Sequence, residues 1–413
     1  MTKRIKLDKK HIGLVTIILA LLTSLSPFAI DTYAPAMASM SFDFGVELSD
    51  IELSMTIYIL GYAIGQFFGG PLSDNFGRKP VVIIGLIAFI ISSYLLSMCD
   101  SIVLLYLFRF TQALGGGFSV VVTMAIVRDL FSGNDLAKRI TYISMFMMTA
   151  PLIAPAVGTF LIKFFGWRSI FIFLSIYSIL VITLFFSYIP ETLKTKNRSR
   201  IVQRSIKGYL ELFSNTKALS LILASAFGFA GMFTFITGSS KIYIDHFNIP
   251  VEYFPILFGS NVILTIILAF VNTRLLRKTE PEKILNIGLI IQLLSGAMLF
   301  IAMSNTNPPF ILVFMLIIMF VGVMGLVFGN ANAIVLQSFP NSSGTTMAVI
   351  GVIEFAAAAL AGFVLHLVQD GTIMPFGLMM FTCTIVSNII YRTQKNKKLN
   401  TESELTIASL TGK

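Results

Sequence analysis

The chain has 413 residues, of which 56% are hydrophobic and only 12% are charged. Because soluble domains carry about 25% charged residues, this composition excludes a soluble enzyme or binding domain and indicates an integral membrane protein. The net charge of +10 does not indicate nucleic-acid binding, because no polar segment is long enough to form a soluble basic domain.

Twelve apolar runs are long enough to cross a bilayer, which takes about 20 helical residues each. They predict an all-α protein with twelve transmembrane helices in two bundles of six. The expected spans are 12–37, 50–71, 80–98, 102–130, 137–162, 167–189, 218–243, 253–276, 283–303, 309–337, 345–369 and 372–391. The first run follows basic residues, as in a signal peptide. It is longer than the apolar run of a signal peptide, about 7–15 residues, so we predict an uncleaved helix.

Lys and Arg concentrate in the segments on one side of these spans. Such a bias marks the cytoplasmic side, so we predict a multi-pass protein of the bacterial inner membrane with both termini in the cytoplasm. The expected divisions are an N-terminal segment 1–11, a first bundle 12–189, a basic linker 190–217, a second bundle 218–391 and a tail 392–413. Apolar residues recur at helical spacing from Ile201 to Phe213, which predicts an amphipathic helix on the inner leaflet. The polar tail is expected to be disordered.

Three charged residues lie well inside the predicted spans: Asp31, Arg109 and Glu354. A charge at membrane depth costs at least about 2.5–3.5 kcal/mol, so such residues usually face a bundle interior and mark an ion or substrate path. We predict that these three couple the protein to protons, with Asp31 as the proton carrier and Glu354 as its rival. A position for Asp31 at the outer headgroup boundary is the alternative. Arg109 cannot lose its proton, so it needs an anionic partner, a wet cavity or a cluster of carbonyl groups.

The loop between the second and third spans combines an acid, a glycine and two bases. Its candidate residues are Gly70, Asp74, Gly77, Arg78 and Lys79. Asp74 can pair with Arg78 at the membrane surface, and Gly77 permits a tight turn. Together with Asp129 at the inner end of the fourth span, these residues predict a latch that holds one of two conformations.

This loop, combined with twelve spans in two halves, resembles the signature of the major facilitator superfamily. Two further stretches resemble its Bcr/CflA branch of drug:proton antiporters: Arg109-Phe110-Thr111-Gln112 with Ile126-Val127-Arg128-Asp129, and Pro190-Glu191-Thr192-Leu193. The fifth span carries Pro151, Pro155 and Gly158, similar to the antiporter motif of exporters, although alanines stand at two positions where glycine is common. The resemblance implies a proton-coupled multidrug efflux transporter that works by alternating access, with no cofactor beyond the proton gradient.

Polar residues on an otherwise apolar wall are expected to line a substrate cavity between the halves. The candidates are Tyr33, Tyr58, Tyr62, Gln112, Asn261, Asn330 and Asn332. For each of them the alternative is ordinary helix packing. The expected partners are small amphipathic substrates, protons and membrane lipid, and the protein is expected to be a monomer.

Other functions of the same fold stay open, namely a dedicated siderophore or metabolite exporter and a nutrient importer. From another class, a membrane receptor that binds without transport also stays open. The sequence contains no metalloprotease or hydrolase motif, so no enzyme and no catalytic residue is predicted. Cys99 and Cys383 lie far apart in apolar runs and the three histidines are isolated, so no metal site is predicted.

Overall fold

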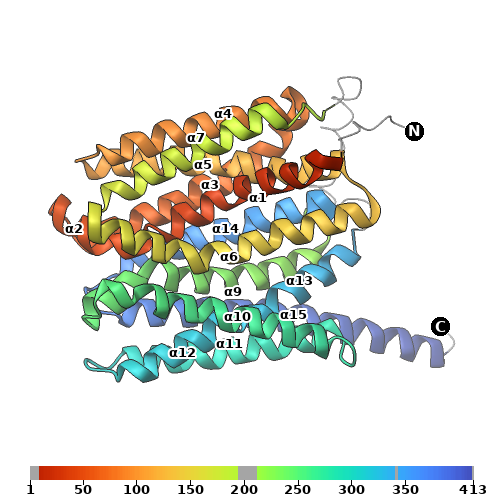
Figure 1. Ribbon diagram of the computed structural model, residues 1–413. Coiled ribbons are helices and arrows are strands. Elements are labelled where there is room, and N and C mark those ends of the chain that lie inside the picture. The colour runs from red at the N-terminus through yellow and green to blue at the C-terminus, as the bar shows by residue number, and fades with distance from the viewer. Residues whose placement is uncertain (1–8, 194–211, 340–342, 412–413) are drawn as a thin grey trace.

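The computed structural model describes residues 9–193, 212–339 and 343–411, and within them the secondary structure is helical (Figure 1). Twelve helices in this part of the chain are long and apolar enough to cross a membrane, and they coincide with the twelve runs expected from the sequence. A helix suits a bilayer because all of its backbone hydrogen bonds are made within the segment. The prediction of an all-α membrane protein with twelve spans is confirmed.

The first half begins with a crossing made of three pieces. Helix α1 (Lys9–Asp31) is followed by a single turn, η1 (Ala34–Ala36), and then by α2 (Met37–Phe44). The break lies next to Pro35, which has no N–H for a helical hydrogen bond. The other crossings of this half are α3 (Leu48–Phe76), α4 (Arg78–Ser97), α5 (Ile102–Leu130), α6 (Gly133–Phe165) and α7 (Arg168–Tyr188).

The second half begins with α9 (Thr216–Ser240), which continues into a π-helical turn, η3 (Lys241–His246). A short turn, η4 (Val251–Tyr253), then leads to α10 (Phe254–Leu275), α11 (Pro281–Met303), α12 (Phe310–Gly322), α13 (Met324–Gln337), α14 (Ser343–Val368) and α15 (Met374–Thr411). Helices α12 and α13 together form one crossing. Each half therefore contributes six crossings.

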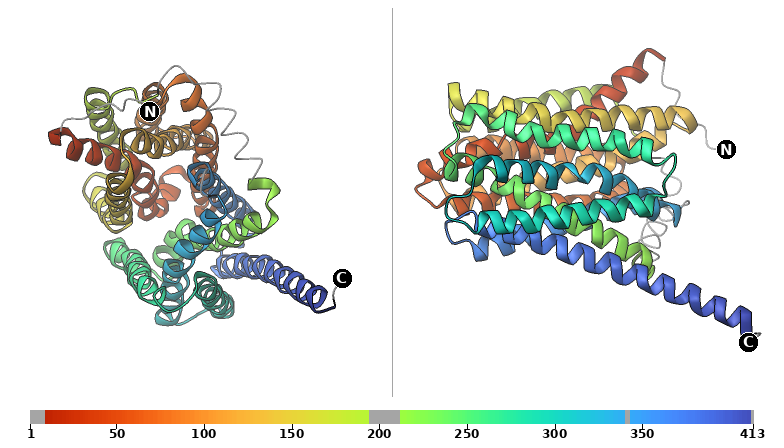
Figure 2. Two further views of the ribbon diagram at one scale, coloured as in Figure 1. Left: turned by 90° about the vertical axis from the view of Figure 1, so that its right-hand side faces the viewer. Right: turned by 90° about the horizontal axis from the view of Figure 1, so that it is seen from below.

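The two halves lie side by side, and the described chain begins and ends at the same end of the bundle (Figures 1 and 2). They meet mainly through two helix pairs, α3 with α14 and α6 with α10. Small residues permit the first of these contacts. A Cβ atom at Gly362 of α14 would lie only 2.4 Å from Oγ1 of Thr56, and one at Gly351 would lie 2.9 Å from Oε1 of Gln66.

Helices α3 and α5 of the first half approach each other backbone to backbone. A Cβ atom at Gly65 would lie 2.5 Å from the backbone oxygen of Leu114, and one at Gly117 would lie 2.5 Å from the backbone oxygen of Tyr62. Lipid tails are as apolar as leucine, so helices in a membrane associate through such close packing rather than through hydrophobic burial. This contact brings Arg109 of α5 against α3.

Two predictions concern segments outside the bundles. The amphipathic helix predicted from Ile201 to Phe213 lies largely outside the described residues. The prediction of a disordered tail is wrong, because α15 continues beyond its membrane crossing to Thr411 (Figure 1). No glycine or proline occurs between Gly377 and Gly412, so nothing in this stretch interrupts the helix once the membrane crossing has nucleated it.

Candidate functional site

Arg109 of α5 is fully buried and links several parts of the first half. Its Nη1 donates hydrogen bonds to the backbone oxygen of Ala29 on α1 (3.2 Å) and to Oε1 of Gln112 (2.9 Å). The guanidinium also lies over the rings of Tyr33 and Tyr58, with each centroid 4.2 Å from Cζ. A desolvated cation–π contact is worth about 2 kcal/mol or more, so the two rings offset much of the cost of burial. The structure therefore shows Arg109 bonded to a backbone carbonyl group, which was one of the partners expected for it, and in contact with two aromatic rings as well.

Asp31 ends α1, two residues after the carbonyl group that Arg109 binds. Only 4% of the residue is exposed, and the helical segment continues past it to Phe44, so the acid is buried inside the bundle, while its depth in the bilayer stays a prediction. Among the ion pairs of the described residues none includes Asp31, so Arg109 contacts Ala29 and Tyr33 on either side of the acid but is not its salt-bridge partner. A buried carboxylate without a basic partner avoids its desolvation cost by taking up a proton. The position of Asp31 therefore suits a proton carrier.

The antiporter-like segment of α6 packs directly against the turn that follows α1. Pro151 and Pro155 both lie inside α6. A Cβ atom at Gly158 would lie only 2.3 Å from the backbone oxygen of Thr32, so any side chain at this position would displace the turn. The close approach of the two backbones occurs at this glycine. Ala150 and Ala154, which stand where glycine is common earlier in the motif, are both buried. The motif and the acid are therefore adjacent parts of one site.

Glu354 on α14 is the corresponding buried acid of the second half. It is 8% exposed, and its Oε1 accepts a hydrogen bond from Oγ of Ser225 on α9 (3.2 Å). It, too, takes part in no ion pair recorded among the described side chains. Like Asp31, Glu354 is therefore a buried acid without an ion-pair partner among the described residues.

An aromatic cluster next to Glu354 joins the two halves. Phe355 packs edge-on against Tyr62 of α3, with ring centroids 4.7 Å apart, and its ring lies 5.1 Å from Phe229 and 5.5 Å from Phe233 of α9. A further contact, of 5.4 Å, joins Phe229 to Phe328 of α13. Sequence reasoning selected only the tyrosine of this cluster, because phenylalanine is frequent throughout the spans and carries no separate signal.

The amide side chains predicted to line the cavity are mostly used in helix packing. Nε2 of Gln112 donates to a serine hydroxyl of α4 (2.9 Å), and Nδ2 of Asn330 donates to an asparagine of α10 (2.8 Å). Asn261 donates to two carbonyl groups of its own helix. All three are buried, whereas Asn332 is only partly buried. Contact of these amides with a substrate stays a prediction, and three of them have structural roles in this conformation.

The predicted latch residues meet around the side chain of Arg78, which is largely buried where α4 begins. Its Nη1 lies 2.5 Å from Oδ1 of Asp74 and donates to Oγ of Ser73 (2.6 Å), while its Nε lies 3.4 Å from Oδ2 of Asp129 on α5. Gly70 contributes the carbonyl group that the Ser73 hydroxyl binds (2.8 Å). One guanidinium therefore connects the ends of three helices.

Sequence reasoning did not assign a role to Glu191, which completes this latch from the segment after α7. Its carboxylate accepts hydrogen bonds from the backbone N–H groups of Arg78 (3.1 Å) and Lys79 (3.0 Å), the free donors at the start of α4. Gly77 has φ of +114°, and a Cβ atom there would lie 2.7 Å from Oε2 of the same carboxylate. The adjacent Thr192 donates to Oδ2 of Asp129 (2.9 Å). The only sequence signal was the resemblance of the Pro190–Leu193 stretch to a family motif.

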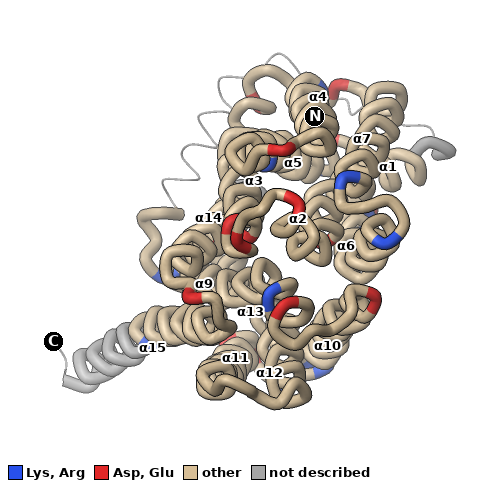
Figure 3. The backbone as a smooth tube through the Cα atoms, turned by 90° about the vertical axis from the view of Figure 1, so that its left-hand side faces the viewer, with Lys and Arg blue, Asp and Glu red and all other residues tan. Residues whose placement is uncertain are grey.

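A second residue without a predicted role is Glu52 of α3, which is only 2% exposed. Its Oε2 accepts a hydrogen bond from Nε2 of Gln369, just after α14 (2.7 Å), and its Oε1 has no partner. Lys163 of α6 pairs with Glu252 of η4 (3.1 Å) at the same end of the bundle. Figure 3 views this end, opposite the termini, and shows charged positions on both halves. The contacts Thr159–Val251, Lys163–Glu252 and Glu52–Gln369 therefore join the two halves at this end.

Comparison with known proteins agrees with this architecture. The family profile described as Major Facilitator Superfamily matches residues 19–362, which is most of the chain. The protein belongs to this superfamily. Its twelve crossings in two halves, and the loop between α3 and α4, are the superfamily features that the sequence predicted.

Two curated relatives agree with the Bcr/CflA resemblance. A bicyclomycin resistance protein homolog of Haemophilus influenzae is 33% identical over 95% of this chain and 99% of its own length. The multidrug resistance protein MdtL of Salmonella paratyphi C is 24% identical over 93% of this chain and 96% of its own length. The protein is therefore a multi-pass bacterial membrane transporter of the major facilitator superfamily.

Among solved structures, a D-xylose–proton symporter shares the fold. The two superpose with a TM-score of 0.75, covering 91% of this chain and 97% of that chain, at 15% sequence identity. At this identity the similarity extends to the arrangement of the helices and not to the substrate.

We expect Asp74→Asn to slow turnover by about tenfold or more while changing substrate affinity much less. Losing a hydrogen bond to a charged group costs roughly 1.5–3 kcal/mol, and a latch slows or speeds cycling only if its contacts differ between two conformations, which is what we predict. Turnover and affinity should be measured separately in reconstituted vesicles. Asp100→Asn, at an exposed ion pair with Arg168, is the matched control. A collapse of affinity with normal cycling of bound substrate would contradict the latch.

Proposed function

We propose that the protein exports small amphipathic molecules from the bacterial cytoplasm in exchange for protons. The observation that carries this proposal is the contact between the exporter-like segment of α6 and the turn after Asp31, made where Gly158 meets the backbone of Thr32. The acid beside this helix segment, which resembles a motif of exporters of this superfamily, is buried and has no ion-pair partner in the described part of the chain. The names of the two relatives, one linked to bicyclomycin resistance and one to multidrug resistance, support a drug-like substrate.

Alternating access would use the two ends of the bundle in turn. In this structure polar contacts join the halves at the end opposite the termini, through Glu52 and Lys163. Opening of that end requires these contacts to break, while Asp31 is the group that takes up a proton from outside. Return to the present arrangement then carries the proton inward, because the same buried site becomes accessible from the other side. Neither step needs a cofactor other than the proton gradient.

The orientation proposed from the charge bias places both termini in the cytoplasm. We expect tags at either terminus and next to Arg200 to be reachable only from the cytoplasmic side. A tag at Glu47, between α2 and α3, should be reachable from outside. Labelling of intact cells and of permeabilised cells with an impermeant reagent measures both positions. If Arg200 were labelled in intact cells, the topology would be reversed.

The aromatic cluster and Glu354 suit a substrate with an apolar body and a positive charge. We expect Glu354→Gln to reduce export of cationic compounds about tenfold more than export of neutral compounds of similar size, which corresponds to ~1.4 kcal/mol. Glu280→Gln, at an exposed glutamate, should leave both classes unchanged. Transport of matched cationic and neutral dyes measures the difference. An equal loss for both classes would assign Glu354 to protons or to folding.

Susceptibility testing in a bacterial host without its own efflux pumps tests the export proposal directly. Expression of this chain should raise the inhibitory concentration of several amphipathic compounds and lower their concentration inside the cell. An uncoupler that collapses the proton gradient should abolish this decrease. Uptake of a nutrient in place of export would establish an importer. Protection against a single metabolite would establish a dedicated exporter, and binding without flux would establish a receptor.

A further inference from the structure

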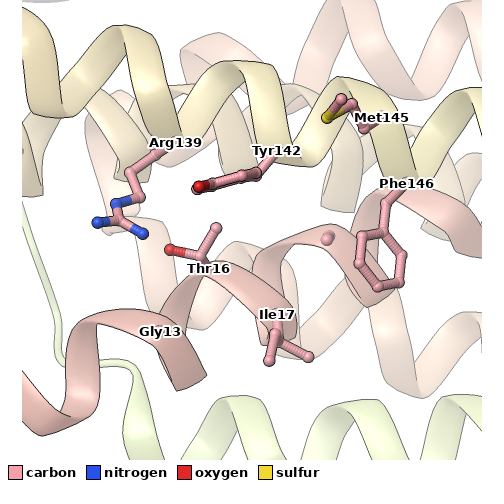
Figure 4. Close-up of a pocket in the computed structure, with 8 residues that line it drawn as sticks. Gly13, Thr16, Ile17, Arg139, Tyr142, Met145 and Phe146 are labelled. Atoms are coloured by element: carbon pink, nitrogen blue, oxygen red, sulfur yellow. The ribbon is translucent and has the colours of Figure 1, made fainter.

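A cavity of about 360 Å³ lies between α1 and α6, near the end of the bundle where α1 begins (Figure 4). Its size is in the lower range of small-molecule pockets. The lining is divided by chemistry: Arg139 and Tyr142 of α6 and Thr16 of α1 lie together, and Ile17, Met145 and Phe146 continue the wall with apolar side chains. The pocket is separate from the Asp31 site, which lies at the opposite end of α1.

Arg139 gives the pocket a positive charge that is not neutralised. Its Nε is buried and has no hydrogen-bond partner, and no ion pair recorded within the described residues includes it. Its nearest aromatic contacts are the rings of Phe131 and Tyr142, both 5.8 Å from Cζ. A guanidinium is always charged and carries five donors in a planar fork. An oxyanion with two oxygens on one atom matches that fork.

The two hydroxyl groups beside Arg139 differ in what they can offer. Thr16 donates its proton to the backbone oxygen of Ile12 (2.8 Å), so it presents only lone pairs to the pocket. The hydroxyl group of Tyr142 points toward Arg139 and Thr16 (Figure 4). It can therefore add a second donor for an anion held by the guanidinium. The polar part of the pocket is suited to an anion and not to a cation.

The rest of the pocket is apolar, and its side chains are partly exposed at the surface of the helices. Ile17 is 48% exposed, and Met145 and Phe146 are exposed to a similar degree. The ligand must therefore carry an anionic group at one end and an apolar chain at the other. Basic pockets between transmembrane helices, at the level of the headgroups, recognise acidic lipids in this way.

We propose that the α1–α6 pocket binds an acidic phospholipid, with its phosphodiester anion on Arg139 and Tyr142 and one acyl chain along Ile17, Met145 and Phe146. The lipid joins the two helices at this end. They touch again at the other end, where Gly158 meets Thr32. Bound lipid therefore sets the spacing of the two helices that form the Asp31 site. Binding itself does not depend on the transported substrate, so it can be tested whether or not the export proposal holds.

Native mass spectrometry of the purified full chain, titrated with phosphatidylglycerol or with phosphatidylcholine, tests this proposal. We expect Arg139→Gln to weaken phosphatidylglycerol binding about tenfold, because it removes a charge-assisted hydrogen bond. Binding of phosphatidylcholine should change less than twofold. Lys138→Gln, at the exposed neighbouring residue, removes the same charge outside the pocket and should retain the lipid. Equal phosphatidylglycerol binding by wild type and Arg139→Gln would overturn the proposal.

A second variant tests the apolar part of the pocket without touching the charge. Ile17→Trp places a larger side chain at an exposed position, so it should fill the pocket at little cost to folding, and it should reduce phosphatidylglycerol binding as well. A photoreactive phosphatidylglycerol should crosslink to peptides containing residues 12–20 or 139–146. Crosslinks confined to other helices would overturn the assignment. If millimolar inorganic phosphate alone displaced the lipid, the pocket would be a site for a simple anion and the lipid assignment would be overturned.

Discussion

Asp31→Asn should abolish export against a concentration gradient while leaving substrate binding measurable. Asparagine keeps the shape of the side chain but cannot take up or release a proton, so substrate movement would no longer be coupled to the gradient. Binding should also lose its dependence on pH, because the group linked to that dependence no longer titrates. Proton-driven accumulation in proteoliposomes measures the first effect, and equilibrium binding over a range of pH measures the second.

The rival proton carrier is Glu354, and the two assignments make opposite claims. If Asp31 carries the proton, Glu354→Gln should retain uphill export of neutral substrates. If the Asp31→Asn protein still exports uphill with normal proton uptake while Glu354→Gln does not, the proton site belongs on α14. Downhill exchange of substrate provides the folding control for both variants, because it requires alternating access but no proton.

Arg109→Lys should lower export at least tenfold and destabilise the folded protein by roughly 2–4 kcal/mol, although the charge is kept. The ammonium group is smaller and more strongly hydrated than a guanidinium. It cannot lie between the rings of Tyr33 and Tyr58 while also donating to Ala29 and Gln112. Thermal unfolding in detergent and transport in proteoliposomes measure the two effects.

Arg168→Lys is the matched control for this substitution. Arg168 also lies over an aromatic ring, that of Trp167 (4.3 Å), and pairs with Asp43 and Asp100, but its side chain is 40% exposed. Surface ion pairs are worth about 0–1 kcal/mol, so this variant should resemble the wild type. Normal stability and transport of Arg109→Lys would show that the buried guanidinium fills space and carries no specific role.

The large loss expected at Arg109 follows from its position between three elements. It contacts α1 two residues before Asp31 and the tyrosine two residues after it. We therefore expect a change at Arg109 to shift Asp31 through these two contacts, without any direct bond between the two charges. For this reason the variant should impair coupling as well as stability, whereas Asp31→Asn should impair coupling alone.

The sequence by itself determined the class of protein and the twelve crossings, and it selected three buried charges but not Glu52. These features depend on local composition, because each crossing satisfies its own backbone within about 20 residues. It also predicted the ion pair between Asp74 and Arg78, because these residues are only four positions apart; their role as a latch stays a prediction. The disordered tail was the wrong prediction, because polarity does not stop a helix that meets no glycine or proline.

Only the tertiary structure decided which side chains meet across helices. Glu191 caps the start of α4 from 113 residues away, and Glu52 bonds to Gln369 across 317 residues. The rings that hold Arg109 come from two other elements, and the anion pocket at Arg139 exists only where α6 lies against α1. Helices in a membrane are all apolar on the outside, so hydropathy does not encode which faces pair. That choice is made by glycine contacts, such as Gly65 on Leu114, whose partners become visible only when the helices are packed.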